Sequence, residues 1–173
     1  RRRHSFPTRR SSDLLAENKP GVLTHVSGLI SRRAFNIETI NAGYTEENDV
    51  TRINIVVNAY NETELNKVIH QMSKLIDVIK IVNISELPSI SRELLLVKVK
   101  ADSPTVRADI VNIANIFRAH IVDVGHENVV IELTGEQDKL AALIDMLSCY
   151  DIIEIARTGP VALSRGATPI KNM

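Results

Sequence analysis

The chain has 173 residues, enough for one ordinary domain or two small ones. Apolar residues make up 44% of it and aromatic residues 3%, with no tryptophan, so its cores must be built from Ile, Val and Leu. No apolar run reaches the roughly 18–20 residues that a membrane-spanning helix needs. The only cysteine, Cys149, excludes an intramolecular disulfide and suits a reducing compartment, so we expect a cytoplasmic location. We also expect the thiol of Cys149 to be buried and inert.

The formal net charge is zero, but the charges are unevenly spread. Residues 1–13, RRRHSFPTRRSSD, hold five arginines against Asp13 alone, which leaves 16 basic and 20 acidic residues in the rest of the chain. This mildly acidic body argues against a nucleic-acid-binding surface.

Residues 1–13 lack any apolar period, so we expect a non-native or disordered basic segment that lies outside the fold. A basic arm or a targeting segment is one interpretation. The string RRRHSFPTRRSSDL also resembles translated sequencing-adapter sequence. In either case only Leu14–Ala16 remain before the next turn, and the first strand is expected to be truncated or replaced.

A polar turn, Glu17–Gly21, opens the first regular unit. The apolar residues after it fall on one face of a helix, with Pro20 expected at the first helical position. They are Val22, Leu23, Val26, Leu29 and Ile30. After Phe35 the period changes to two and indicates a strand. The turn therefore places free N–H groups at a helix N-terminus, which attracts carboxylates and phosphates.

The same two periods order the rest of the chain. Further elements of the first half are a strand at 50–58, a helix with its stripe at 65–75 and a strand at 78–84. The second half repeats the order with a strand at 94–101, a helix from Ser103, a hairpin over 121–134, a helix at 140–147 and a strand at 152–156. The sequence predicts an α+β protein of two ferredoxin-like βαββαβ modules.

The predicted boundaries follow from these elements. The modules span residues 14–85 and 92–158, joined by a linker at 86–91. The tail 159–173 has two Gly, two Pro and no period, and is expected to be surface coil.

Four strings carry a family resemblance. PGVLTHVSGLISRRAFNIETINAG, which starts at Pro20, resembles the first half of an ACT domain, a small-molecule-sensing βαββαβ module. SRRAFNIETINAG within it more narrowly resembles the regulatory (small) subunit of acetolactate synthase, also called acetohydroxyacid synthase. RELLLVKVKA and VALSRG, in the second half and the tail, are similar to the same family, so the resemblance covers residues 16–168.

The resemblance implies a regulatory subunit without catalytic activity in the biosynthesis of valine, leucine and isoleucine. Its partner would be the catalytic (large) subunit, which alone would carry thiamine diphosphate, magnesium and FAD. The chain would activate that subunit and make it sensitive to feedback inhibition by valine. ACT modules of this type pair edge to edge, so a homodimer is expected.

The implied valine site lies at the turn and the strand that follows the helix. Its residues would be Asn18, Gly21, Val22, Leu23, Asn36 and Ile37, and it would lie at an interface between paired ACT domains. From the residues alone, the turn can supply donors for a carboxylate and an apolar wall, and we expect it to face the start of the strand at Asn36. The residues also allow a simple capping turn. The second half has Asp102-Ser103-Pro104 in place of this turn and is expected to bind no valine.

Other classes of protein leave weaker signals. No nucleophile motif, phosphate-binding loop or metal motif occurs, and the five histidines are scattered. An ACT sensor of another amino-acid enzyme or of a transcription regulator is the main alternative. An RNA-binding module of the same topology would need exposed aromatics on its central strands, and the strand at 50–58 has none.

Overall fold

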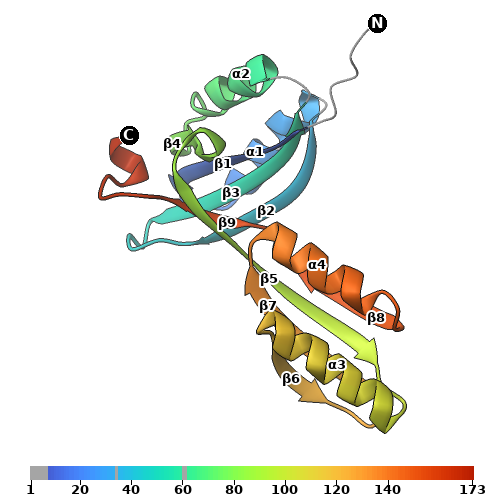
Figure 1. Ribbon diagram of the computed structural model, residues 1–173. Helices are drawn as coiled ribbons and strands as arrows, with labels where there is room; N and C mark the ends of the chain where they lie inside the picture. The colour runs from blue at the N-terminus through green and yellow to red at the C-terminus, as the bar shows by residue number, and fades with distance from the viewer. Residues whose placement is uncertain (1–7, 34, 60–61) are drawn as a thin grey trace, which may run out of the picture. The chain divides into compact units, whose positions relative to one another are not determined.

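A computed structural model describes residues 8–33, 35–59 and 62–173 of the chain (Figure 1). The chain folds as two units. One holds the chain up to Ile90 together with Ala162–Met173, and the other holds Ser91–Val161. Each unit contains a βαββαβ module, which confirms the predicted fold class.

The first unit is a four-stranded antiparallel sheet in the order β2-β3-β1-β4. Its elements are β1 (Thr8–Glu17), α1 (Val22–Arg32), β2 (Asn36–Tyr44), β3 (Val50–Ala59), α2 (Glu62–Met72), β4 (Val78–Asn83) and the short η1 (Ile84–Glu86). Alternate residues of β3, among them Ile53 and Ile55, pack against Val26 and Ile30 of α1 and Leu65 of α2. The period-2 and period-3.6 patterns thus meet in one core.

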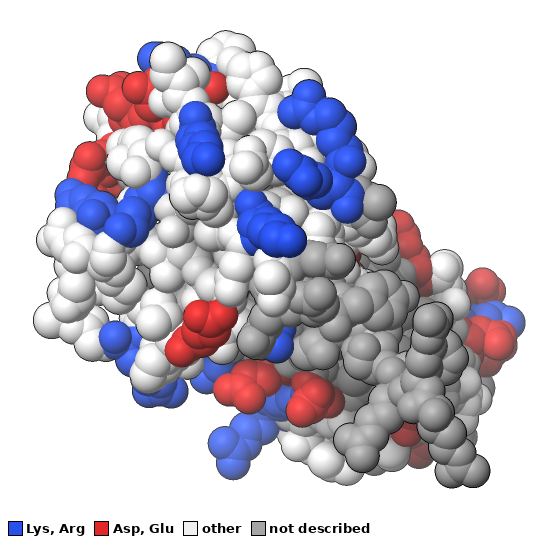
Figure 2. Space-filling model, turned by 90° about the horizontal axis from the view of Figure 1, so that it is seen from above, with Lys and Arg blue, Asp and Glu red and all other residues white. Residues whose placement is uncertain are grey.

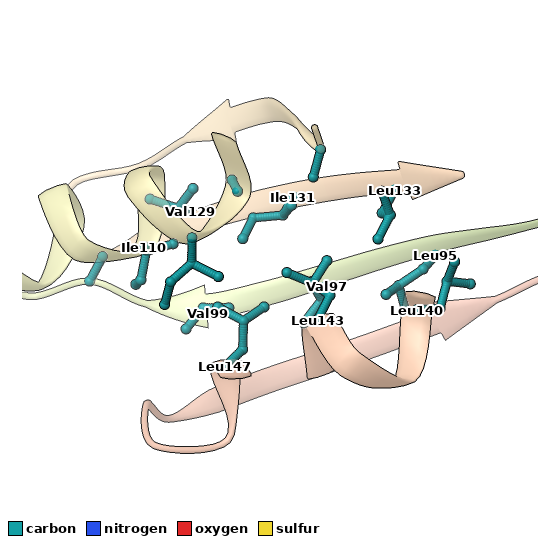
Figure 3. Close-up of a cluster of buried hydrophobic side chains, with 14 residues drawn as sticks. Leu95, Val97, Val99, Ile110, Val129, Ile131, Leu133, Leu140, Leu143 and Leu147 are labelled. Carbon is teal, nitrogen blue, oxygen red and sulfur yellow. The ribbon is translucent and has the colours of Figure 1, made fainter. Parts of the chain in front are cut away.

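The second unit repeats this topology with the order β6-β7-β5-β8. Its elements are β5 (Ser89–Lys100), α3 (Pro104–Phe117), β6 (His120–Val124), β7 (Asn128–Gly135), α4 (Gln137–Leu147) and β8 (Ile152–Arg157). Val97 of β5 and Ile131 of β7 point from the sheet toward Ile110 of α3 and Leu143 of α4 (Figure 3). All four side chains are fully buried.

The first strand is not truncated. β1 begins at Thr8, and its residues pair with β3 on one side, from Thr8 opposite Ala59 to Glu17 opposite Val50. From Ser12 onward β1 also pairs with β4. The expectation that residues 8–13 lie outside the fold is therefore wrong, while residues 1–7 lie outside the described residues. Strand pairing uses backbone groups that every residue except proline carries, so a polar sequence can occupy the central position.

The central position of β1 buries polar side chains, which costs free energy of folding. Ser12 is 3% exposed, and among the described residues its hydroxyl has no hydrogen-bond partner. Asp13 is 1% exposed and accepts hydrogen bonds from Arg52 Nε and Asn54 Nδ2, both at 3.0 Å. Burial raises the pKa of Asp13 above its ordinary value, against the opposing effect of the Arg52 guanidinium. The first half of β1 is held by its backbone ladder and by Arg52 rather than by apolar packing.

The C-terminal segment is also more ordered than expected. The tail 159–173, predicted as surface coil, contains β9 (Val161–Ser164), which pairs with β5, and the 3-10 turn η2 (Ile170–Asn172). Ala162 and Ile170 are buried within the first unit, and the Arg165 N–H donates to the Pro88 carbonyl over 2.7 Å. Two isolated anchors leave no period in the sequence, which is why the prediction was wrong.

We predict that Ser12→Ala stabilises the first unit. The substitution removes a buried hydroxyl without a partner, and such a group costs about 1–3 kcal/mol. The free energy of unfolding in urea should rise by about 1 kcal/mol. Ser91→Ala in β5, where the serine is only partly buried, is the matched control and should leave it unchanged. A loss of stability in Ser12→Ala would mean that this hydroxyl has a partner in solution.

Candidate functional site

Residue types that carry catalysis do not gather in the described part of the chain. No group of three or more His, Cys, Asp or Glu there could hold a metal ion. Cys149 lies just after α4, is exposed rather than buried as expected, and donates from Sγ to the Met146 carbonyl at 3.3 Å. None of the helices described is long and apolar enough to cross a membrane.

The turn between β1 and α1 is built around a left-handed glycine. Gly21 has φ +91° and is the N-cap of α1, which begins at Val22. Pro20 therefore precedes the cap, and the prediction that it is the first helical residue is wrong. A residue with a Cβ adopts this conformation only with strain, so glycine is what lets the chain reverse here.

Hydrogen bonds hold this turn against the β2–β3 hairpin. The Asn18 N–H donates to the Asp49 carbonyl over 2.8 Å, and the Thr51 hydroxyl donates to Asn18 Oδ1 over 3.0 Å. On the other side, the Glu17 N–H donates to the Asp77 carbonyl over 2.8 Å. The turn is thus fixed at both of its flanks, and its position depends on the end of β1.

The N-terminus of α1 presents backbone donors. No side chain caps this end, and the first helical hydrogen bond runs from the His25 N–H to the Gly21 carbonyl at 3.0 Å. The N–H groups of Val22, Leu23 and Thr24 precede that bond and have no acceptor within the helix. The first turn also contains no acidic residue. The positive end of the helix dipole is therefore available to an anion.

A cavity of about 390 Å³ lies at this helix end, a size typical of small-molecule sites. Its lining comes from the turn, the start of α1, the end of β2 and the first residues of β3. The lining residues are Glu17, Asn18, Lys19, Pro20, Gly21, Val22, Leu23, Ala42, Gly43, Tyr44, Thr51 and Ile53. We call this space the turn cavity. It combines backbone donors with an apolar wall from Leu23, Ala42 and Ile53.

The predicted site residues divide into two groups. Asn18, Gly21, Val22 and Leu23 all line the turn cavity. Asn36 and Ile37 do not, because α1 runs back along the sheet and β2 begins at the opposite end. The expectation that the turn faces the start of this strand within one chain is wrong. The end of β2, which includes Tyr44, lies there instead, and the sequence argument missed it.

Charge and aromatic content bear on the RNA-binding alternative. On the face shown in Figure 2, basic side chains are interspersed with acidic and uncharged ones. The central strands of the first unit, β1 and β3, contain no aromatic residue over Thr8–Glu17 and Val50–Ala59. Base stacking in modules of this topology relies on such aromatics.

Comparison with known proteins gives the family. Residues 13–80 match the family described as the AHAS small subunit-like ACT domain, and residues 92–166 match the family described as the small subunit of acetolactate synthase. The chain belongs to the acetolactate synthase small-subunit family. The predicted resemblance is confirmed, and the turn cavity lies inside the segment that matches the ACT domain.

Individual relatives agree along most of the chain. A probable acetolactate synthase small subunit of Archaeoglobus fulgidus is 49% identical over 153 residues, which cover 88% of this chain and 94% of that protein. The acetolactate synthase small subunit of Bacillus subtilis is 42% identical, with 88% of each chain covered. The crystal structure of the Thermotoga maritima small subunit matches with a TM-score of 0.82 at 34% identity, covering 93% of this chain and 99% of that one.

Two glycine substitutions in this region should have opposite effects on stability. Gly21→Ala strains the left-handed cap and should lower the free energy of unfolding by roughly 1–2 kcal/mol. Gly28→Ala, inside α1 with open space around the new methyl, should raise it by up to about 1 kcal/mol. Urea unfolding of both variants measures the difference. Equal effects would show that Gly21 does not hold this conformation in solution.

Proposed function

We propose that the chain is the non-catalytic regulatory subunit of an acetolactate synthase. It associates with the catalytic subunit, activates it and confers feedback inhibition by valine. The membership of the small-subunit family supports the role, and the turn cavity is the observation that carries the effector site. That thiamine diphosphate, magnesium and FAD reside on the catalytic partner alone stays a prediction, as does the cytoplasmic location.

Valine matches the chemistry of the turn cavity. Its carboxylate is placed at the uncapped end of α1, on the N–H groups of Val22 and Leu23. Its isopropyl group is placed against Leu23, which is 45% exposed, and against Ala42 and Ile53. Its ammonium group needs acceptors, and the amide oxygen of Asn36 would be one if this residue reached the cavity.

A second copy of the chain can bring Asn36 there. β2 is an edge strand of its sheet, and in its nine residues only Glu38 is charged, so it leaves an edge open to pairing. The other edge, β4, carries Lys80. An antiparallel pair of β2 strands centred on Ile40 sets Asn36 opposite Tyr44 of the second copy, beside that copy's turn cavity. The two groups of predicted site residues then form one site in a homodimer.

A site shared by two copies gives valine a physical means of control. Valine shifts the complex only if it binds one arrangement of the dimer better than another, and such couplings are typically about 1–3 kcal/mol. Contacts from both copies supply that difference, because they form together only in one relative placement of the β2 strands. The catalytic subunit would respond to this placement.

Asn18→Asp tests the cavity as the valine site. Asn18 lines the turn cavity, so the new carboxylate adds a negative charge to the space in which the valine carboxylate is placed, and like charges at about 4 Å cost roughly 1–4 kcal/mol between water and a partly buried site. Valine affinity by calorimetry should fall at least about five-fold, and acetolactate formation with the catalytic subunit should lose its valine sensitivity but not its activation.

The control is Asn66→Asp, the same change on the exposed face of α2. This variant should bind valine with the affinity of the wild type. Both should bind one valine per chain, because the second unit lacks the turn. Wild-type affinity in Asn18→Asp would place the effector elsewhere. Valine binding without association with the catalytic subunit would favour an amino-acid sensor of another enzyme.

Ile40→Asp tests the shared site. Ile40 is 39% exposed on β2, and at the centre of the proposed pair two carboxylates would face each other. The variant should be monomeric in analytical ultracentrifugation and should bind valine at least ten-fold more weakly. Ile76→Asp, at a residue 93% exposed in the turn before β4, is the control and should stay dimeric. A monomeric variant with full valine affinity would show that one chain suffices.

A further inference from the structure

The segment Ala162–Met173, which we call the strap, belongs to the first unit although it follows the second unit in sequence. Ile170, 7% exposed, anchors it. Polar contacts hold its end, since Lys171 pairs with Glu47 of the β2–β3 hairpin and Lys80 of β4 donates to the Met173 carbonyl. The strap is thus fastened to the hairpin and to the edge strand.

A second cavity, of about 520 Å³, lies between the strap and the sheet, and we call it the strap cavity. From the sheet it is lined by Leu15, Val50, Arg52 and Ile79, and from the strap by Leu163 and Ile170 among others. Apart from the pairing of β9 with β5 and the bond from Arg165 to Pro88, the strap is held by Ile170 and by these polar contacts over incompletely filled space. Segments with few buried apolar contacts can open locally at a low free energy.

The strap cavity and the turn cavity lie back to back on one sheet. Successive residues of a strand point to opposite faces, and β3 follows this rule here. Val50 and Arg52 line the strap cavity, whereas Thr51 and Ile53 line the turn cavity. Tyr44 at the end of β2 lines both.

The hairpin turn Thr45–Asp49 is held from both sides. On one side the Asp49 carbonyl accepts from the Asn18 N–H, and on the other Glu47 pairs with Lys171 of the strap. The Thr45 hydroxyl ties the turn together, because its oxygen accepts from the Glu47 N–H at 3.1 Å and it donates to the Val50 carbonyl at 3.1 Å. The strap and the turn Glu17–Gly21 therefore both bind to the hairpin turn Thr45–Asp49.

We propose that docking of the strap and binding of the effector are coupled through this hairpin, and that the docked strap is the form with higher effector affinity. A docked strap fixes Glu47 and so presents the Asp49 carbonyl in place for Asn18, which removes an ordering cost from effector binding. The coupling is reciprocal, so the bound effector favours the docked strap. The proposal rests on valine as the effector of the turn cavity.

Ile170→Asp, which undocks the strap, provides the first test. The variant should bind valine about five-fold or more weakly by calorimetry, within the usual range of such couplings. In the wild type, valine should slow hydrogen exchange of strap amides, and in the variant this protection should be gone. Ile76→Asp is the matched control, since Ile76 lines neither cavity, and should keep both properties.

A charge exchange gives an independent test if Ile170→Asp fails to fold. Glu47→Lys and Lys171→Glu should each weaken valine binding and speed strap exchange, and the double variant should restore both, which loss of a merely structural side chain would not do. Wild-type valine affinity in a variant whose strap exchanges freely would overturn the coupling alone. Absence of valine binding in the wild type would overturn the proposed function, and the coupling with it.

Discussion

The first unit depends on the insertion of β1 between β3 and β4. The turn that ends at Gly21 follows the last residue of this strand, and the bond from the Glu17 N–H to the Asp77 carbonyl continues the pairing of β1 into the turn. Up to Asp13 the backbone ladder supplies most of what holds β1, because Ser12 and Asp13 contribute buried polar groups, whereas Leu14 and Ala16 further along join the apolar core. Arg52 offsets part of the cost of burying Asp13, and the same guanidinium borders the strap cavity.

A second constraint is the direction of the chain through a βαββαβ unit. β1 and β2 run parallel because both pair antiparallel with β3, so the end of β1 meets the end of β2 and never its start. The turn at Gly21 and the residue Asn36 therefore lie at opposite ends of one module. In the homodimer proposed above, edge pairing about a two-fold axis unites them, and the proposed effector site is then shared between two copies of the chain.

The sheet also separates two cavities with different characters. The turn cavity has backbone donors at a helix end, and the strap cavity has Leu15, Val50, Arg52 and Ile79 of the sheet beneath the strap. Because β3 contributes alternate residues to each, a movement of the hairpin beyond it changes both. This arrangement gives a small module two surfaces through which one ligand can act.

The sequence by itself determined the two modules, the helix after Gly21 and the donors at its start, because periods of 2 and 3.6 and the chemistry of a glycine turn are local properties of the chain. Only the tertiary structure decided the extent of β1, the separation of Asn36 from the turn, and the docking of the strap by Ala162 and Ile170. Strand pairing joins backbone groups regardless of side chain, and two anchors eight residues apart leave no period. These features depend on which distant segments meet, and no local pattern records that.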